Sequence, residues 1–448
     1  MKQEASTTVI PDTVRHYVLG ILLLTYVFNF VDRQILAILL SPIKSEMGFS
    51  DSALGFLTGF GFALFYVAVG IPMAMWADRG NRRNIIALSL TIWSGMTALC
   101  GLAQNFVQLA LARIGVGIGE AGCSPPAHSM IADLYGQQRR ATALAIYSLG
   151  VPFGVLLGFV IGGWVNELYG WRMAFLAAGI PGLVLAFVVR FTLPEPPRGL
   201  AENRPAEQAS PTLSDTIGFL LRRPAFIHMV AGGALSAFVG YAVLGWIPSV
   251  FIRSHGMTTG EVGTWLGLIL GIPGGLGIML GGHLADSLGA TDRRWSLWIV
   301  SVAQLVAMPF YIAVFLSGDA NSALWFLVVP VALGNFYQAT TFAQTQGLVP
   351  LRMRATAAAI MLFVLNVIGL GLGPTTVGLL SDVLGPRFGD DSLRYSLTVL
   401  SLACLWAAYH YYKAGQHLPH DLVALPDTPL CQDDASELVD GHLQHGAS

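Results

Sequence analysis

Four charged residues lie inside long apolar stretches of the sequence, where they could move protons or bind an anion: Asp32, Arg33, Arg113 and Glu120. A charge at the centre of a membrane-spanning helix costs on the order of 2.5–3.5 kcal/mol on insertion scales. Such residues persist when they line a polar cavity, pair with one another or take part in function. Asp32 and Arg33 are adjacent and about 100° apart around a helix, so they should not pair. Arg113 and Glu120 share one helix face with roughly 10 Å of rise between them, which leaves room for water or an anionic head group.

These four charges sum to zero when all of them are ionised. If Asp32 or Glu120 takes up a proton, the site becomes net positive and an arginine loses its partner. We therefore predict Asp32 and Glu120 as proton-coupling residues, and Arg33 and Arg113 as residues that bind an anionic substrate. The alternative is a permanent structural ion pair.

The composition predicts that the bilayer surrounds this chain. Of 448 residues, 54% are hydrophobic and only 11% are charged, and the mean hydropathy is +0.62. Soluble domains carry about 25% charged residues. The net charge of −2 gives no reason to expect nucleic acid as a partner. The four cysteines have no metal or disulfide spacing, there is no nucleotide-binding loop, and no Ser or Cys stands beside a base, so we expect no cofactor, no metal and no enzyme activity.

Twelve stretches are long and apolar enough to span a membrane, which predicts an all-α membrane protein with twelve transmembrane helices in two six-helix halves. We expect an N-terminal tail over 1–15, a first half over 16–192, a linker over 193–224, a second half over 225–414, and an acidic, disordered tail over 415–448. Most loop Lys and Arg residues fall on the linker side, which places the linker and both termini in the cytoplasm. A short amphipathic helix is expected over 212–221. The predicted centres are Leu24, Phe65, Ser94, Gly119, Phe153, Gly182, Phe238, Ile272, Ala307, Gly334, Val367 and Leu402.

The two halves repeat one another. A shift of 208 positions overlays 51–59 on 259–267 and carries Asp78 onto Asp286, while the run that begins at Arg140 recurs at Arg354. Parallel repeats of this kind describe the two pseudo-symmetric halves of the major facilitator superfamily, in which substrate binds near the midplane between them. The same shift places Gly240 and Tyr241 where Asp32 and Arg33 stand, so the second half lacks those charges.

Polar residues of the second half gather near its predicted helix around Gly334, and we predict four of them as substrate-binding: Asn335, Tyr337, Gln338 and Thr341. A charged half that faces a weakly polar, aromatic half suits an amphiphile, with its ionic head on one side and its apolar tail on the other.

Two further patterns concern movement between the halves. A cytoplasmic loop, whose sequence resembles the loop signature of the superfamily, holds four residues predicted to form a gate: Asp78, Arg79, Arg82 and Arg83. The alternative is that these arginines only fix the orientation of the chain. Glycines recur every four residues from Gly150 to Gly162 and from Gly263 to Gly275, which predicts either a sliding contact between the halves or static close packing.

Residues 29–34 (NFVDRQ), 41–44 (SPIK) and 112–122 (ARIGVGIGEAG) resemble the Spinster-like branch of the superfamily. Eukaryotic members of that branch move lysophospholipids and sphingosine 1-phosphate. The resemblance implies that Asp32, Arg33 and Glu120 occupy its proton-coupling and head-group positions, and that Arg113 is its helix-four arginine.

Together the residues and the resemblance predict a proton-dependent secondary transporter of an amphiphilic anion, a lysophospholipid or sphingolipid-like molecule, that works by alternating access. We expect a monomer in a bacterial inner membrane, with the lipid bilayer, the substrate and protons as its partners. The alternatives are a transporter or exporter of small organic anions or drugs and, outside the transporters, a membrane sensor.

Overall fold

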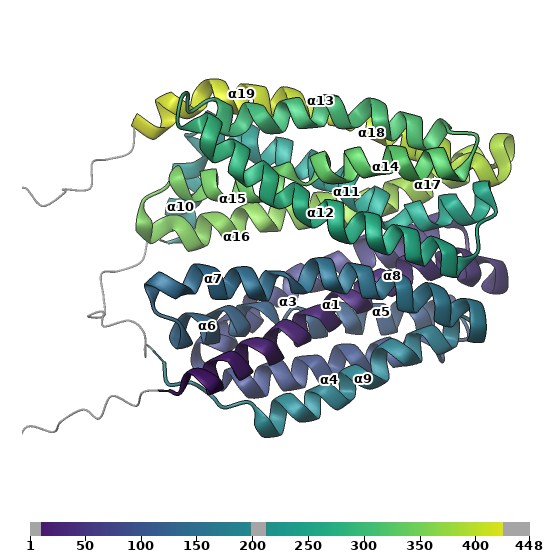
Figure 1. The fold of residues 1–448 in the computed structure, drawn as a ribbon, viewed down its shortest axis with the longest axis horizontal. Coiled ribbons are helices and arrows are strands. Elements are labelled where there is room, and N and C mark those ends of the chain that lie inside the picture. Colours follow the sequence, from purple (N-terminus) through teal and green to yellow (C-terminus); the bar gives the residue numbers. More distant parts are fainter. Residues whose placement is uncertain (1–9, 199–211, 424–448) are drawn as a thin grey trace, which may run out of the picture.

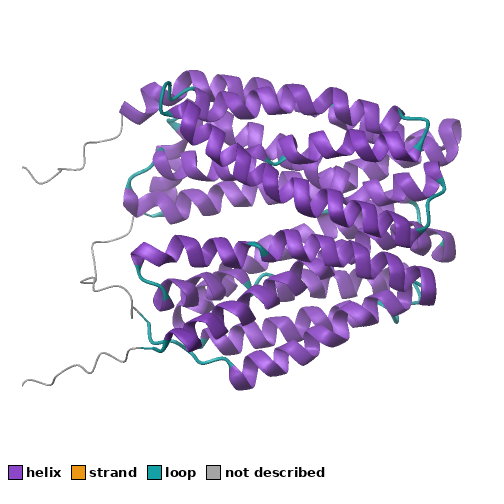
Figure 2. Ribbon diagram, in the orientation of Figure 1, coloured by secondary structure: helices purple, strands orange, loops and turns teal. Residues whose placement is uncertain are grey.

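The computed structural model describes residues 10–198 and 212–423, and within these ranges the secondary structure is helical throughout (Figures 1 and 2). The first half contains α1 (Asp12–Met47), α2 (Asp51–Thr58), α3 (Phe60–Arg79), α4 (Arg82–Cys100), α5 (Phe106–Glu120), α6 (Ser124–Leu134), α7 (Gln137–Ser148), α8 (Gly150–Tyr169) and α9 (Trp171–Thr192). The short helix α10 (Leu213–Leu221) precedes the second half. The second half contains α11 (Pro224–His255), α12 (Thr259–Gly289), α13 (Trp295–Leu316), α14 (Ala320–Gly334), α15 (Phe336–Gly347), α16 (Arg354–Leu365), the π-helix η2 (Asn366–Leu372), α17 (Gly373–Phe388), α18 (Ser392–Ser401) and α19 (Ala403–Val423), with short 3₁₀ turns η1 (Leu351–Met353) and η3 (Gly389–Asp391).

Many of these helices are consecutive pieces of one crossing, interrupted by short irregular turns. Ten helical stretches of the described chain are long and apolar enough to cross a membrane. The last of them, 354–422, holds two crossings separated by η3, and α4 supplies one more. The prediction of twelve transmembrane helices is therefore confirmed, and so is the short helix before the second half, α10.

Some of the expected boundaries differ from the structure. Helix α1 already begins at Asp12, inside the expected tail, because the acidic Asp12 in the first turn interacts favourably with the helix dipole and Val18 and Leu19 are buried one to two turns later. Helix α19 continues to Val423, beyond 414, since Leu418 still packs into the core. Residues 1–9, 199–211 and 424–448, which include most of the expected linker and acidic tail, lie outside the described residues.

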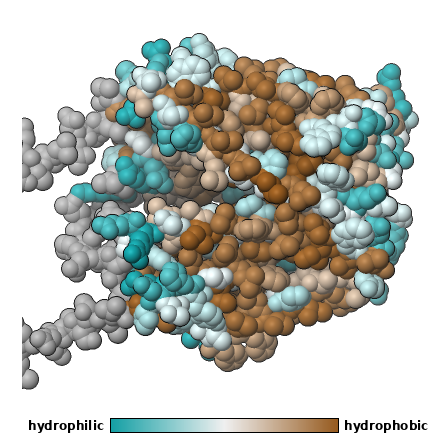
Figure 3. Space-filling view, viewed as in Figure 1, coloured by the Kyte–Doolittle hydropathy of each residue, from teal (hydrophilic) through white to brown (hydrophobic). Residues whose placement is uncertain are grey.

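The two halves lie side by side and meet closely at one end only (Figure 1). At the end opposite the linker, a single core cluster contains residues of both halves, including Ile35 and Leu54 from the first and Trp246 and Leu266 from the second. Toward the linker side each half has its own core, apart from Leu370 and Tyr241 of the second half, which also pack on the first. The surface is apolar around the middle, polar at both ends, and hollowed between the halves on the linker side (Figure 3). The molecule is thus sealed on one face and open on the other.

The two glycine repeats serve different contacts. On α8, Gly150, Gly154, Gly158 and Gly162 pack against α1 of the same half. On α12, the repeat from Gly263 to Gly275 packs against α8 and therefore lies between the halves. The second repeat therefore lies at a contact between the halves, as the first of the two alternatives requires, whereas the first repeat fits the alternative of close packing, because α8 presents its glycine face to α1.

Candidate functional site

An ion pair between two different helices lies at the centre of the first half. Arg33 of α1 donates from Nε to Glu120 Oε2 at 2.5 Å. Glu120 is the last residue of α5, which stops there because Pro125 and Pro126 cannot continue a regular helix. The Glu120 side chain is fully buried, and that of Arg33 is 14% exposed. Arg33 is therefore the side of the pair that reaches open space.

Aromatic rings surround the guanidinium of Arg33. Its Cζ lies 5.1 Å from the ring centroid of Phe30, 5.4 Å from that of Phe62 and 4.8 Å from that of Tyr66. Cation–π contacts of this kind stabilise a charge that has lost water. The rings therefore help to hold the Arg33 guanidinium in place beside the cavity.

The second pair of predicted charges lies deeper. The Cζ atom of Arg113 lies 5.3 Å from the ring centroid of Phe62, the ring that also contacts Arg33. Nη1 of Arg113 is 3.5 Å from the backbone oxygen of Asp32. Asp32 is completely buried, and its carboxylate lies beside the side chains of Thr97 and Trp93. Asp32 therefore stands behind the site, close to Arg113 and Glu120, and does not face the open space.

A cavity separates the halves at the level of this ion pair. Both predicted arginines line it. The first half contributes Phe30, Arg33, Gln34, Ala37, Thr58, Phe62 and Arg113, and the second contributes Tyr241, Leu244, Gly245, Leu370 and Pro374. One wall is thus cationic and aromatic, whereas the other is apolar except for the tyrosine. An anionic group can approach Arg33 from this space while an apolar chain lies against the opposite wall.

The four polar residues predicted as ligands on the second half do not line this cavity. Tyr337 and Thr341 are buried in the second half, where the Thr341 hydroxyl is hydrogen-bonded to Tyr411 at 2.6 Å. Asn335 donates to the backbone oxygen of Val331 at 2.8 Å, and the exposed Gln338 donates to Asn335. Asn335, Gln338 and Thr341 thus find their hydrogen-bond partners within the second half.

Sequence reasoning did not assign Tyr241 to the site. The signal was present, because the repeat places Tyr241 at the position equivalent to Arg33. Equivalent positions of two parallel repeats face the same central space, and Tyr241 lines the cavity opposite Arg33.

The predicted gate residues lie on the linker side. Arg82 is fully buried and bonded to Glu195 at 2.8 Å, to Ser129 at 2.9 Å and to Asp133, all in the first half or the chain that directly follows it. Asp78 and Arg79 are exposed on the open side of the molecule. Arg83 donates its backbone N–H to Glu195 at 2.8 Å. In this open state, these bonds of Arg82 and Arg83 lie within the first half and the chain that directly follows it.

The fold and site define a polytopic membrane transporter with two related halves. The family model described as Major Facilitator Superfamily matches residues 22–374. The chain is 38% identical over 404 residues to an MFS-type efflux pump of Mycolicibacterium smegmatis, covering 88% of this chain and 92% of the relative. It is 28% identical to Protein spinster homolog 1 of Xenopus tropicalis, covering 86% and 78%.

Among solved structures, a bacterial homolog to the human lysosomal transporter Spinster, in an inward-facing and unoccupied conformation, has a TM-score of 0.84 with 31% identity. The match covers 92% of this chain and 99% of that one. The chain belongs to the Major Facilitator Superfamily and, within it, to the Spinster-like branch. It is a multi-pass membrane transporter, not an enzyme.

Proposed function

We propose that this protein is a proton-dependent secondary active transporter of an amphiphilic anion, a lysophospholipid or a sphingolipid-like molecule, and that it works by alternating access. The observation that carries the proposal is the Arg33–Glu120 ion pair at the wall of the cavity between the halves. The arginine is the residue that lines the cavity, and the carboxylate lies behind it.

This arrangement supports a competition for Arg33. When Glu120 is ionised, it occupies the guanidinium and leaves little attraction for another anion. When Glu120 takes up a proton, the charge of Arg33 becomes available to a phosphate or carboxylate head group in the cavity. Proton binding and anion binding then favour each other, and by linkage each raises the affinity of the protein for the other. Asp32, close to Arg113, would serve as a second proton site.

The opposite wall supports an apolar tail. Leu244, Leu370 and Pro374 offer apolar surface, and Phe30 and Phe62 extend it beneath the arginines. Each methylene group that leaves water for such a surface gains about 0.8 kcal/mol. Affinity should therefore increase with the chain length of the substrate.

A second candidate function is the export of small organic anions or drugs. The relative with 38% identity is called an efflux pump, which favours this reading. A small anion would use the arginines but gain little from the apolar wall, so chain-length dependence distinguishes the two.

The orientation and the gate follow from the same proposal. With the linker and both termini in the cytoplasm of a bacterial cell, the open face of this structure is the cytoplasmic one. Asp78, Arg79, Arg82 and Arg83 would then close that face against the second half during the transport cycle.

The test is uptake of labelled lysolipids of graded chain length, and of small organic anions, into proteoliposomes with and without a pH gradient. Glu120→Gln should abolish the response to the gradient while the protein remains folded, because the amide cannot take up the proton. The matched control is Glu261→Gln, since Glu261 only completes the capping box at the start of α12. An unchanged pH response in Glu120→Gln would remove Glu120 from the coupling mechanism.

A further inference from the structure

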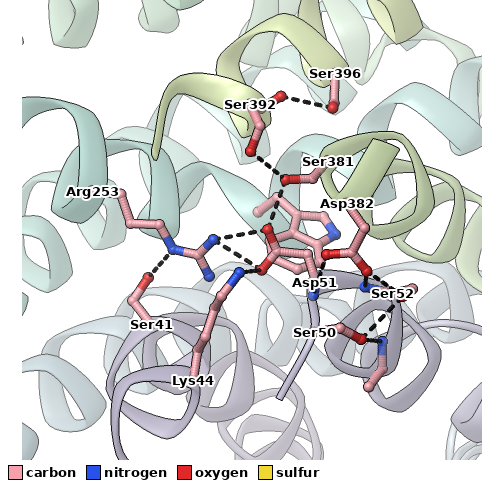
Figure 4. Close-up of polar contacts among 12 residues, drawn as sticks. Ser41, Lys44, Ser50, Asp51, Ser52, Arg253, Ser381, Asp382, Ser392 and Ser396 are labelled. Carbon is pink, nitrogen blue, oxygen red and sulfur yellow. Dashed lines mark hydrogen bonds and ion pairs between the residues drawn. The ribbon is translucent and has the colours of Figure 1, made fainter. Parts of the chain in front are cut away.

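The second crossing of each half begins at the sealed face, with α2 in the first half and α12 in the second. The first backbone N–H groups of a helix have no hydrogen-bond partner within that helix. At the start of α2, the side chain of Ser50 accepts from the N–H of Ala53. The N–H groups of Asp51 and Ser52 donate instead to Asp382, at 2.9 and 2.8 Å, and the Ser52 hydroxyl also contacts this carboxylate. Asp382 belongs to α17 of the other half (Figure 4).

The same arrangement occurs in reverse at the start of α12. There Thr258 is the local cap and accepts from the N–H of Glu261. The N–H of Gly260 donates at 2.7 Å to Oε2 of Glu167, which belongs to α8 of the first half. Each half thus extends one carboxylate that caps a helix of its partner half.

The two caps are equivalent positions of the internal repeat. Asp51 and Thr259 are related by 208 positions, and Glu167 and Asp382 by 215. The glycines beside them obey the same offset, since Gly163 packs on Thr259 and Gly378 packs on Asp51. The earlier repeat from Arg140 to Arg354 has an offset of 214. The π-helix η2 lies between Arg354 and Asp382. A π-turn accommodates one added residue in a helix, which accounts for the change of offset from 214 to 215 and leaves Asp382 at the position equivalent to Glu167.

An ion cluster reinforces the cap at α2. The Asp51 carboxylate accepts two bonds from Arg253 of the second half, at 2.9 and 3.0 Å, and one from Lys44 at 2.7 Å. Ser381, the neighbour of Asp382, donates to the same carboxylate at 2.7 Å (Figure 4). The Asp51 side chain is 2% exposed and that of Arg253 is 11% exposed. The positive charges allow Asp51 and Asp382 to lie close together.

We propose that Asp382 and Glu167 are a pair of reciprocal latches that hold this face shut, and that both caps must break for it to open. A carboxylate at a helix N-terminus satisfies orphan donors and interacts favourably with the helix dipole. Both caps exist only while the halves touch, because each joins one half to the other. They therefore stabilise the sealed state relative to any state in which this face is open.

The proposal is tested by the distance between the halves, without any substrate. Spin labels at Leu102→Cys and Arg387→Cys, exposed positions at the sealed end of the first and second half, report the distance in lipid nanodiscs after the native cysteines are replaced by alanine. Replacing a helix cap by alanine should raise the ratio of open to sealed molecules by roughly 2- to 30-fold. Asp382→Ala should lie near the upper end, since it removes two backbone bonds in a half-buried site. Glu167→Ala should lie near the lower end, because Glu167 is exposed.

The double variant should show about the product of the two ratios, since the caps share no partner. Asp382→Asn, which keeps one acceptor oxygen, should fall between the wild type and Asp382→Ala. The matched control is Asp319→Ala, because Asp319 also caps a helix at this face, through Ser322 at 3.0 Å, but within one half.

A double variant with the distance distribution of the wild type would overturn the proposal. So would an Asp319→Ala control that opens the face as much as the latch variants do. Neither result depends on the transported substrate, so the failure of the latch and the failure of the proposed function can be told apart.

Discussion

The cavity-facing walls of the two halves differ, although the halves share one scaffold. The first half presents Arg33 and Arg113, with Glu120 behind them. The second half presents Tyr241 at the position equivalent to Arg33 and otherwise an apolar surface. At the sealed face, by contrast, the repeat is retained down to the capping carboxylates. Symmetry is kept where the halves hold each other and lost where they face the central cavity, so the charged residues of that cavity belong to the first half.

The largest effect is expected from removing the charge that defines the first half. Arg33→Ala leaves the Glu120 carboxylate buried without its partner, which should lower the free energy of unfolding by about 3–5 kcal/mol and abolish uptake. Thermal unfolding in detergent and uptake into proteoliposomes measure the two effects. The loss of stability should shrink in Arg33→Ala/Glu120→Gln, whereas uptake should stay absent.

The control for Arg33→Ala is Arg172→Ala, which removes an ion pair with Glu46 that is exposed on the sealed side. Exposed pairs contribute about 0–1 kcal/mol, so this variant should remain close to the wild type. Equal destabilisation by the two substitutions would contradict the prediction that loss of Arg33 from its buried pair costs more stability than loss of Arg172 from its exposed pair.

A smaller effect is expected from giving the second half the charge that it lacks. Tyr241→Arg places a second guanidinium opposite Arg33 across the cavity, and the two like charges repel each other at low dielectric. We expect uptake to fall on the order of 10-fold, because the halves close less readily around the site. Tyr241→Phe should transport nearly as the wild type does. Wild-type uptake by Tyr241→Arg would show that the difference in charge between the walls is not required.

The smallest effect is expected from a charge of the second half that lies away from the cavity. Hydrogen bonds from Ser322 hold the pKa of Asp319 below its usual value. Because its pKa is lowered in the folded state, the stabilisation of α14 by Asp319 is present above the ordinary aspartate pKa and is lost as pH falls through the folded value. Asp319→Ala should remove this pH dependence from amide hydrogen exchange at the start of α14 and leave the pH response of uptake unchanged. A changed transport response would break the assignment of coupling to the first half.

The sequence by itself determined the membrane class, the helix count and the internal repeat. These follow from composition and from spacing along the chain, because a helix that crosses lipid must satisfy its own backbone and be apolar over about 20 residues. The unusual placement of Arg33 and Arg113 was also readable, since a charge in an apolar stretch stands out without knowledge of any neighbour, and both residues line the cavity.

Only the tertiary structure decided which groups meet. Arg33 pairs with Glu120, 87 positions away on another helix, and that contact depends on how α1 and α5 are placed relative to each other in the first half. The rotation of α15 turned Thr341 toward Tyr411 and away from the cavity. Glu167 and Asp382 look like ordinary helix charges in the sequence, because each accepts from the first N–H groups of a helix in the opposite half and that contact exists only where the halves meet. Pairing between helices is set by their mutual orientation, which local sequence patterns do not encode.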